Sequence, residues 1–128
     1  MSDRVRVIEH GIILLDFSNI PDPDKELHHS AVAKKLISSQ PRGQVLVLTD
    51  VTGSNFSQKS LESLKDLMQH NRPYVKASAL VGLSPLTRVV FRAVMALTGR
   101  DIRVFESRKE AIAYLLSRRL DSAIPAPG

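Results

Sequence analysis

The 128-residue chain contains no cysteine, and its aromatic side chains with stacking faces are few, namely two tyrosines and four phenylalanines. Without cysteine the chain forms neither disulfides nor thiolate metal sites, and it has no thiol nucleophile. Proteins that bind single-stranded nucleic acid stack bases on aromatic rings beside a basic groove. Here the net charge is +5, but the basic residues are spread along the sequence rather than gathered in a stripe. We therefore expect no nucleic-acid partner.

The chain also lacks a long apolar run. Its most apolar stretch, residues 89–97, is interrupted by Arg92 and is too short to span a bilayer. The N-terminus is charged from Asp3 and Arg4 onwards, and the apolar segment of a signal peptide does not follow. These features predict a cytoplasmic protein with no membrane span.

Motifs for common catalytic and cofactor chemistry are missing as well. The sequence has no phosphate-binding loop of the Gly-Lys-Ser/Thr kind, no dinucleotide glycine fingerprint and no Ser-His-Asp order. His28 and His29 are adjacent, so they point to different sides of a helix and cannot form an i, i+4 metal pair. We expect a protein that is not an enzyme, with no catalytic residue, cofactor or metal.

What the sequence does contain is an alternation of apolar strands and amphipathic helices. Two short apolar runs flank His10-Gly11, which predicts an N-terminal hairpin. Strand and helix patterns then alternate to the end of the chain, and such repeated units require a mainly parallel sheet. We predict one α/β domain over residues 1–128, with a core at about 4–118 and a tail at 119–128. The predicted domain has one sheet of about five strands, mostly parallel, and four helices.

In such sheets, function usually lies beyond the carboxyl ends of the strands. Two of these ends carry an aspartate, because Asp16 and Asp50 each follow an apolar run. If the two strands are neighbours, the carboxylates could hold Mg²⁺ beside a phosphate or accept a phosphoryl group, as in a hydrolase or phosphotransferase. The alternative is that each aspartate caps a turn.

Thr52 is a sharper candidate. It follows a strand and lies a few residues before a helix, whose free N–H groups favour an added phosphate. Gly53 permits a backbone conformation and a close approach that a side chain would hinder. The residues therefore indicate a phosphate-binding or phosphorylated turn.

The whole chain, at about residues 4–118, resembles the SpoIIAA-like branch of the STAS superfamily. The resemblance is carried by the element order, by residues 14–19 and 48–53, and by residues 76–83 leading to 99–105. In bacterial anti-sigma-factor antagonists of this superfamily, the corresponding turn reads Asp-Ser-Ser-Gly, and a partner kinase phosphorylates the serine before glycine. Asp50-Val51-Thr52-Gly53 matches that order, with Val51 and Thr52 in place of the serines.

The resemblance implies a regulatory module that binds a protein partner, such as a kinase or another regulator. Its candidate phosphoacceptors are Thr52 and Ser54, and its candidate partner loop contains Asp16, Asp50, Gly53 and Asn55. The branch is also similar in fold to CRAL-TRIO lipid-binding domains. That likeness implies an alternative role as carrier or sensor of a small apolar or anionic ligand.

The helix predicted after Ser84-Pro85 carries a second candidate surface. At about 100° per residue, one face collects its apolar side chains, namely Leu86, Val90, Ala93, Val94 and Leu97. Phe91 and Met95 fall outside that face, near Arg88 and Arg92. Exposed, this surface would suit a partner protein, a second copy in a homodimer, or an acidic lipid. The alternative is that neighbouring elements cover Phe91 and Met95.

Overall fold

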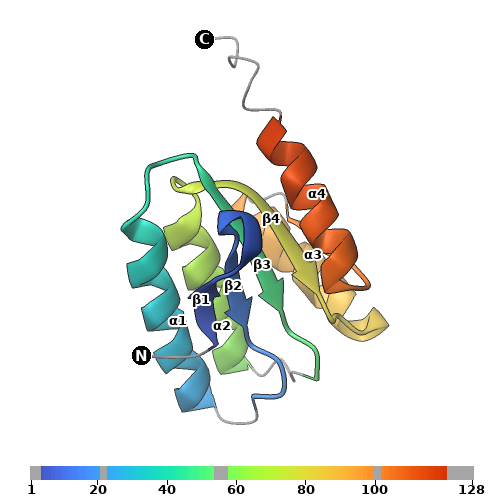
Figure 1. Cartoon of the computed structure of the whole chain (residues 1–128). Helices are drawn as coiled ribbons and strands as arrows, with labels where there is room; N and C mark the ends of the chain where they lie inside the picture. Colours follow the sequence, from blue (N-terminus) through green and yellow to red (C-terminus); the bar gives the residue numbers. More distant parts are fainter. Residues whose placement is uncertain (1–3, 21–22, 54–57, 100–101, 121–128) are drawn as a thin grey trace.

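The domain is built around a five-stranded sheet, shown in Figure 1. The structure is a computed structural model and describes residues 4–20, 23–53, 58–99 and 102–120. The strands stand in chain order: β1 (Val5–Val7), β2 (Ile13–Asp16), β3 (Val45–Asp50), β4 (Val75–Val81) and β5 (Arg103–Phe105). β1 is antiparallel to β2, and every other pair is parallel. The predicted α/β fold with its N-terminal hairpin is confirmed.

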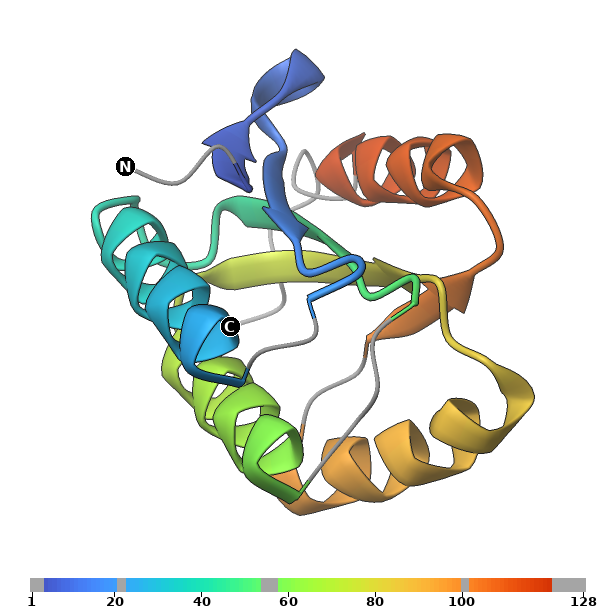
Figure 2. The same ribbon diagram turned by 90° about the horizontal axis from the view of Figure 1, so that it is seen from below.

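The helices cover the two faces of the sheet unequally. Three of them, α1 (Pro23–Ser38), α2 (Gln58–Asn71) and α3 (Pro85–Thr98), lie on one face, whereas α4 (Arg108–Leu120) lies alone on the other (Figure 2). Right-handed crossovers between strands that advance in one direction put every connecting helix on the same side. Because α4 follows the last strand, it is not a crossover and is free to cover the opposite face.

Successive residues of the central strands supply both cores. Leu15 and Val47 belong to the core beneath α1, α2 and α3, while Leu14 and Leu48 belong to the core beneath α4. All of β3 is buried, as expected for a strand that is covered on both faces. This explains why the strands read as continuous apolar runs rather than as alternating ones.

Side-chain caps begin the last two helices, and the first of them, Ser84, is at the predicted start of α3. Ser84 Oγ accepts a hydrogen bond of 3.2 Å from the Thr87 N–H, and Ser107 Oγ accepts one of 3.2 Å from the Glu110 N–H. Gly99 ends α3 in the left-handed conformation with φ 67°. Among the described residues, no helix is both long enough and apolar enough to cross a membrane.

The orientation predicted for α3 is wrong. Phe91 is only 1% exposed and lies in the core, and Met95 is partly buried against that core. The exposed large side chains are instead Leu86 at 76%, Val89 at 64% and Leu97 at 69%. The hydrophobic period of α3 favours burial of the face with Leu86, Val90 and Leu97, opposite the two arginines. The fold instead buries the adjoining sector, which contains Phe91, Val94 and Thr98.

Of the four residues predicted to form the α3 surface, two arginines remain on it. Arg92 is exposed, and Arg88 is partly exposed beside the loop that follows β5. Phe91 and Met95 do not belong to an exposed surface, because the fold buries the sector that contains the largest side chain of the helix.

Candidate functional site

The two aspartates predicted at the strand ends are neighbours. Asp16 ends β2 and Asp50 ends β3, and the two residues are direct partners in the parallel register. Each aspartate accepts hydrogen bonds on Oδ1 from the residue two positions later. Asp16 accepts from the Ser18 N–H at 3.1 Å and its hydroxyl at 2.5 Å, and Asp50 accepts from the Thr52 N–H at 2.9 Å and its hydroxyl at 2.6 Å. The two turns are therefore built alike.

Backbone hydrogen bonds hold these turns against one another beyond the strands. The Phe17 N–H donates to Asp50 O at 2.8 Å, and the Asn19 N–H donates to Thr52 O at 2.8 Å. On the other side, the Val51 N–H donates to Val81 O at 2.9 Å. The loops after β2, β3 and β4 consequently form one continuous edge.

Two glycines allow this close stacking. A Cβ on Gly53, which has φ 72°, would overlap the side-chain oxygen of Asn19. A Cβ on Gly82, which has φ 93°, would overlap the backbone nitrogen and the hydroxyl of Thr52. The Thr52 turn therefore rests directly on the bend that follows β4, where only glycine fits.

Arg108, at the start of α4, joins the two carboxylates. Its Nε and Nη2 atoms each lie 2.8 Å from Asp50 Oδ2, and Nη2 lies 3.6 Å from Asp16 Oδ2. Arg4 lies on the other side of Asp16, with Nη1 3.8 Å from Oδ1, and it donates to Ser18 O at 2.6 Å. The Arg108 guanidinium thus offsets the negative charge of two carboxylates at once.

The sequence interpretation missed Arg108. Its signal was the Ser107 cap, which places Arg108 in the first turn of the helix after β5. Because all parallel strands end at the same edge, a first-turn side chain of that helix reaches the aspartates of β2 and β3. Arg108 contacts both aspartates only because α4 packs on the face opposite α1, α2 and α3, and sequence spacing does not reveal that packing.

These contacts favour the turn-capping role of the aspartates over metal or phosphoryl chemistry. Both Oδ1 atoms already accept two hydrogen bonds, and both Oδ2 atoms face the cationic Arg108. A divalent cation here would have to displace that guanidinium. In the part of the chain that the structure describes, no cluster of three or more histidine or acidic side chains offers a metal site.

Hydrogen bonding tunes the acidity of Asp16. Burial by itself raises the pKa of this carboxyl, but the hydrogen bonds donated by the Ser18 side chain and backbone, with the charges of Arg108 and Arg4, outweigh it. The pKa of Asp16 in the folded protein therefore lies below its ordinary value. The ionised form is the one that the fold stabilises.

A pH-dependent stability difference follows from this shift. Because the folded pKa is lowered, the contribution of Asp16 is complete above the unfolded value of about 3.9 and disappears as the pH falls through the folded value. We expect Asp16→Asn to be less stable than the wild type at neutral pH, with a difference that shrinks below about pH 4. Urea unfolding across that range measures it, and Ser18→Ala should reduce the same pH dependence. A difference that does not change with pH would contradict this assignment.

Thr52 is an exposed residue at this edge. Its hydroxyl donates to Asp50 Oδ1, and Arg108 donates to the other oxygen of the same carboxylate. Asp16, Asp50, Thr52 and Gly53 are thus brought together. Ser54 and Asn55, the other two residues predicted for this loop, lie outside the described residues, as does the predicted tail beyond residue 120.

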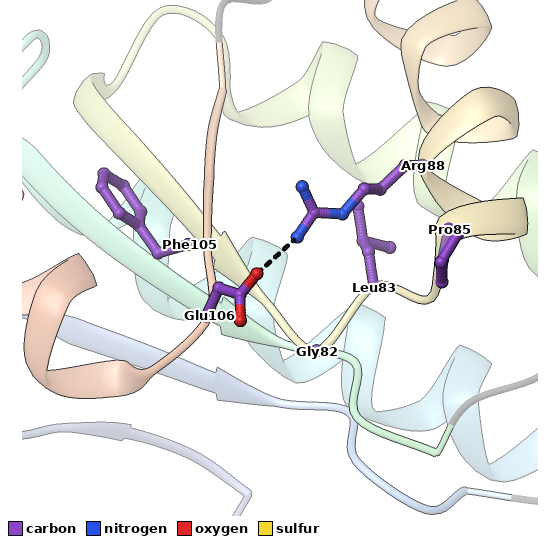
Figure 3. A pocket seen from close by; sticks show the side chains of 6 residues that line it. All are labelled: Gly82, Leu83, Pro85, Arg88, Phe105 and Glu106. Atoms are coloured by element: carbon purple, nitrogen blue, oxygen red, sulfur yellow. Dashed lines mark ion pairs between the residues drawn. The ribbon is translucent and has the colours of Figure 1, made fainter.

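A hollow lies beside this edge, between the ends of β4 and β5. Its volume is about 380 Å³, and it is lined by Gly82, Leu83, Pro85, Arg88, Phe105 and Glu106 (Figure 3). The chain leaves β4 toward α3 and leaves β5 toward α4, on opposite faces, and such a divergence opens a crevice at the carboxyl edge of a sheet. Arg88 Nη2 lies 3.7 Å from Glu106 Oε1 across it.

The fold and this edge together define a small α/β domain whose strand-end loops form a braced, polar surface. No protein-family model, curated protein or solved structure that was compared with the chain matches it.

Proposed function

We propose that this domain is a non-enzymatic regulatory module of STAS type in the cytoplasm, which binds a protein partner through the loops at the carboxyl edge and is switched by phosphorylation of Thr52. The observation that carries the proposal is the position of the Thr52 hydroxyl. Thr52 is an exposed residue, and its hydroxyl donates to the carboxylate of Asp50 that Arg108 also binds. A modification there acts on charges that already hold two loops together.

The chemical step is a transfer from ATP. A partner kinase moves the γ-phosphoryl group to Thr52 Oγ1, the hydroxyl proton leaves, and ADP is released. The hydroxyl then no longer donates to Asp50, and a group with a charge of about −1.5 to −2 stands beside that carboxylate. Repulsion between the two anions favours a rearrangement of the turn.

Arg108 is the residue that we expect to move when Thr52 is phosphorylated. A phosphate on Thr52 competes for its guanidinium, which now binds Asp50 and also faces Asp16. When Arg108 turns to the phosphate, both aspartates lose a cationic neighbour, so the change reaches the loops after β2 and β3 together. The added charge also repels an acidic partner surface.

The test begins with identification of the modified residue. The protein is incubated with lysate of its host and ATP, and phosphosites are mapped by mass spectrometry. We expect a phosphate on Thr52 that Thr52→Val prevents and Ser54→Ala leaves in place. Modification of Ser54 instead would move the switch two residues along the same loop, and modification of neither residue would remove it.

Partner binding gives the second part of the test. Thr52→Glu, which adds a negative charge, is expected to weaken capture of the partner by about tenfold or more, while Thr52→Ser keeps the hydroxyl and binds normally. Arg108→Gln removes the group that responds and should disturb the turn without any phosphate. Unchanged capture by Thr52→Glu would count against the switch.

A second candidate function is that of a carrier or sensor for a small anionic molecule held in the hollow beside β4 and β5. The observation that favours it is the Arg88 guanidinium at the hollow, which is the cationic group of a lining that also contains Glu106. An anionic ligand would take the place of the Glu106 carboxylate beside Arg88. Native mass spectrometry of freshly purified protein should then reveal a bound mass that Arg88→Gln loses. A wild-type protein without added mass would count heavily against this role.

A further inference from the structure

The outer face of α3 is apolar and has no covering element among the described residues. Leu86, Val89 and Leu97 are all exposed, and they lie along one side of the helix with Ala93 between them. In Figure 2, α3 runs along the outer margin of its layer, with its far side turned away from the sheet. Of the five large hydrophobic side chains that are exposed in the described structure, three belong to this stripe.

The charges around the stripe are of one sign along the helix itself. Arg88 and Arg92 border it, and no acidic residue occurs between Pro85 and Thr98. Arg72 adds a further cation at the carboxyl end, where a Cβ on Gly99 would come within 3.4 Å of its Nη1. Glu106 pairs with Arg88 at the amino end. With the net charge of +5 on the chain, this surface complements an anionic one.

A second copy of the chain fits this surface less well. A stable dimer buries about 800 Å² on each partner, and three aliphatic side chains on one helix fall well short of that area. Two antiparallel copies of α3 would also bring the same border of each helix together, so that Arg92 of one copy approaches Arg92 of the other. Like charges opposed in this way weaken the contact.

We propose that the outer face of α3 docks the domain on an anionic lipid surface, with the aliphatic stripe entering the headgroup region and the arginines contacting lipid phosphates. Such interfacial binding combines burial of an apolar face with attraction between basic residues and acidic lipids. It requires no spanning helix. Thr52 is not among the residues that make this contact.

Co-sedimentation with vesicles tests the docking. The full chain is mixed with phosphatidylcholine vesicles that contain about 30% phosphatidylglycerol, and with vesicles of phosphatidylcholine alone. We expect binding to the anionic vesicles only, weakened by added salt, and reduced about tenfold by Leu86→Ser combined with Leu97→Ser. Arg92→Glu should also weaken it. Val7→Ser, at a 55% exposed site on β1, is the matched control and should bind like the wild type.

A fluorescence measurement locates the contact. The chain has no tryptophan, so Leu97→Trp introduces a single reporter on the stripe and Val7→Trp a single reporter on β1. Anionic vesicles should shift the emission of the first to shorter wavelength and leave the second unchanged. The proposal is overturned if anionic vesicles bind no protein, or if the Val7 variants respond as the α3 variants do. It is also overturned if sedimentation velocity shows a dimer that the Leu86 and Leu97 substitutions dissociate, because the stripe then serves a second copy.

Discussion

Replacing Phe91 by alanine is expected to lower the free energy of unfolding by about 3–5 kcal/mol. The ring is almost fully buried in the core beneath α1, α2 and α3, so truncation removes its apolar contacts and leaves a cavity. Urea unfolding monitored by circular dichroism measures the loss.

Leu86→Ala is the matched control on the same helix. Leu86 is mostly exposed, so the truncation should change the free energy of unfolding by no more than about 0.5 kcal/mol. The two substitutions together decide which face of α3 meets the sheet. The opposite outcome, a stable Phe91→Ala and a destabilised Leu86→Ala, would restore the orientation predicted from the sequence.

Gly82→Ala is expected to cost about 2–4 kcal/mol, because it combines an unfavourable backbone conformation with a steric overlap. The new Cβ would have to occupy the space of the Thr52 backbone, and Gly82 itself has φ 93°. Relief of the overlap requires the Asp50–Gly53 turn to move away from β4. Amide resonances of Thr52 and Val51 should therefore shift, as measured by NMR alongside the unfolding experiment.

Gly43→Ala separates the two causes. Gly43 also has a positive φ, at 72°, but a Cβ there would meet no atom within 4 Å. Its substitution should cost only the backbone term, about 1–2 kcal/mol. If Gly82→Ala costs no more than Gly43→Ala, then Thr52 does not depend on close contact with the bend after β4.

The stability experiments bear on the proposed switch. Thr52 is held by Asp50 on one side and by the Gly82 bend on the other, so a phosphate on its hydroxyl meets a turn that has little room to adapt. A turn braced in this way converts a local change of charge into displacement of neighbouring loops. Gly82→Ala therefore offers a way to disturb the Thr52 turn without adding charge.

The sequence alone predicted the order of the elements, the N-terminal hairpin and the start of α3. Each of these depends on local information, namely hydrophobic period, turn residues and capping side chains within a few positions of one another. It also predicted that Asp16 and Asp50 could be neighbours, because parallel strands end at one edge of the sheet.

The surroundings of those aspartates depend on tertiary packing. Arg108 lies 58 residues from Asp50 in the chain, and it reaches the carboxylate because α4 packs on the face opposite α3. The hydrophobic period of α3 favoured a rotation that the fold does not adopt, because a period carries no information on which side chains fit against the sheet and the neighbouring helices. The sheet and the neighbouring helices selected the sector that contains Phe91, and they left Leu86, Val89 and Leu97 outside.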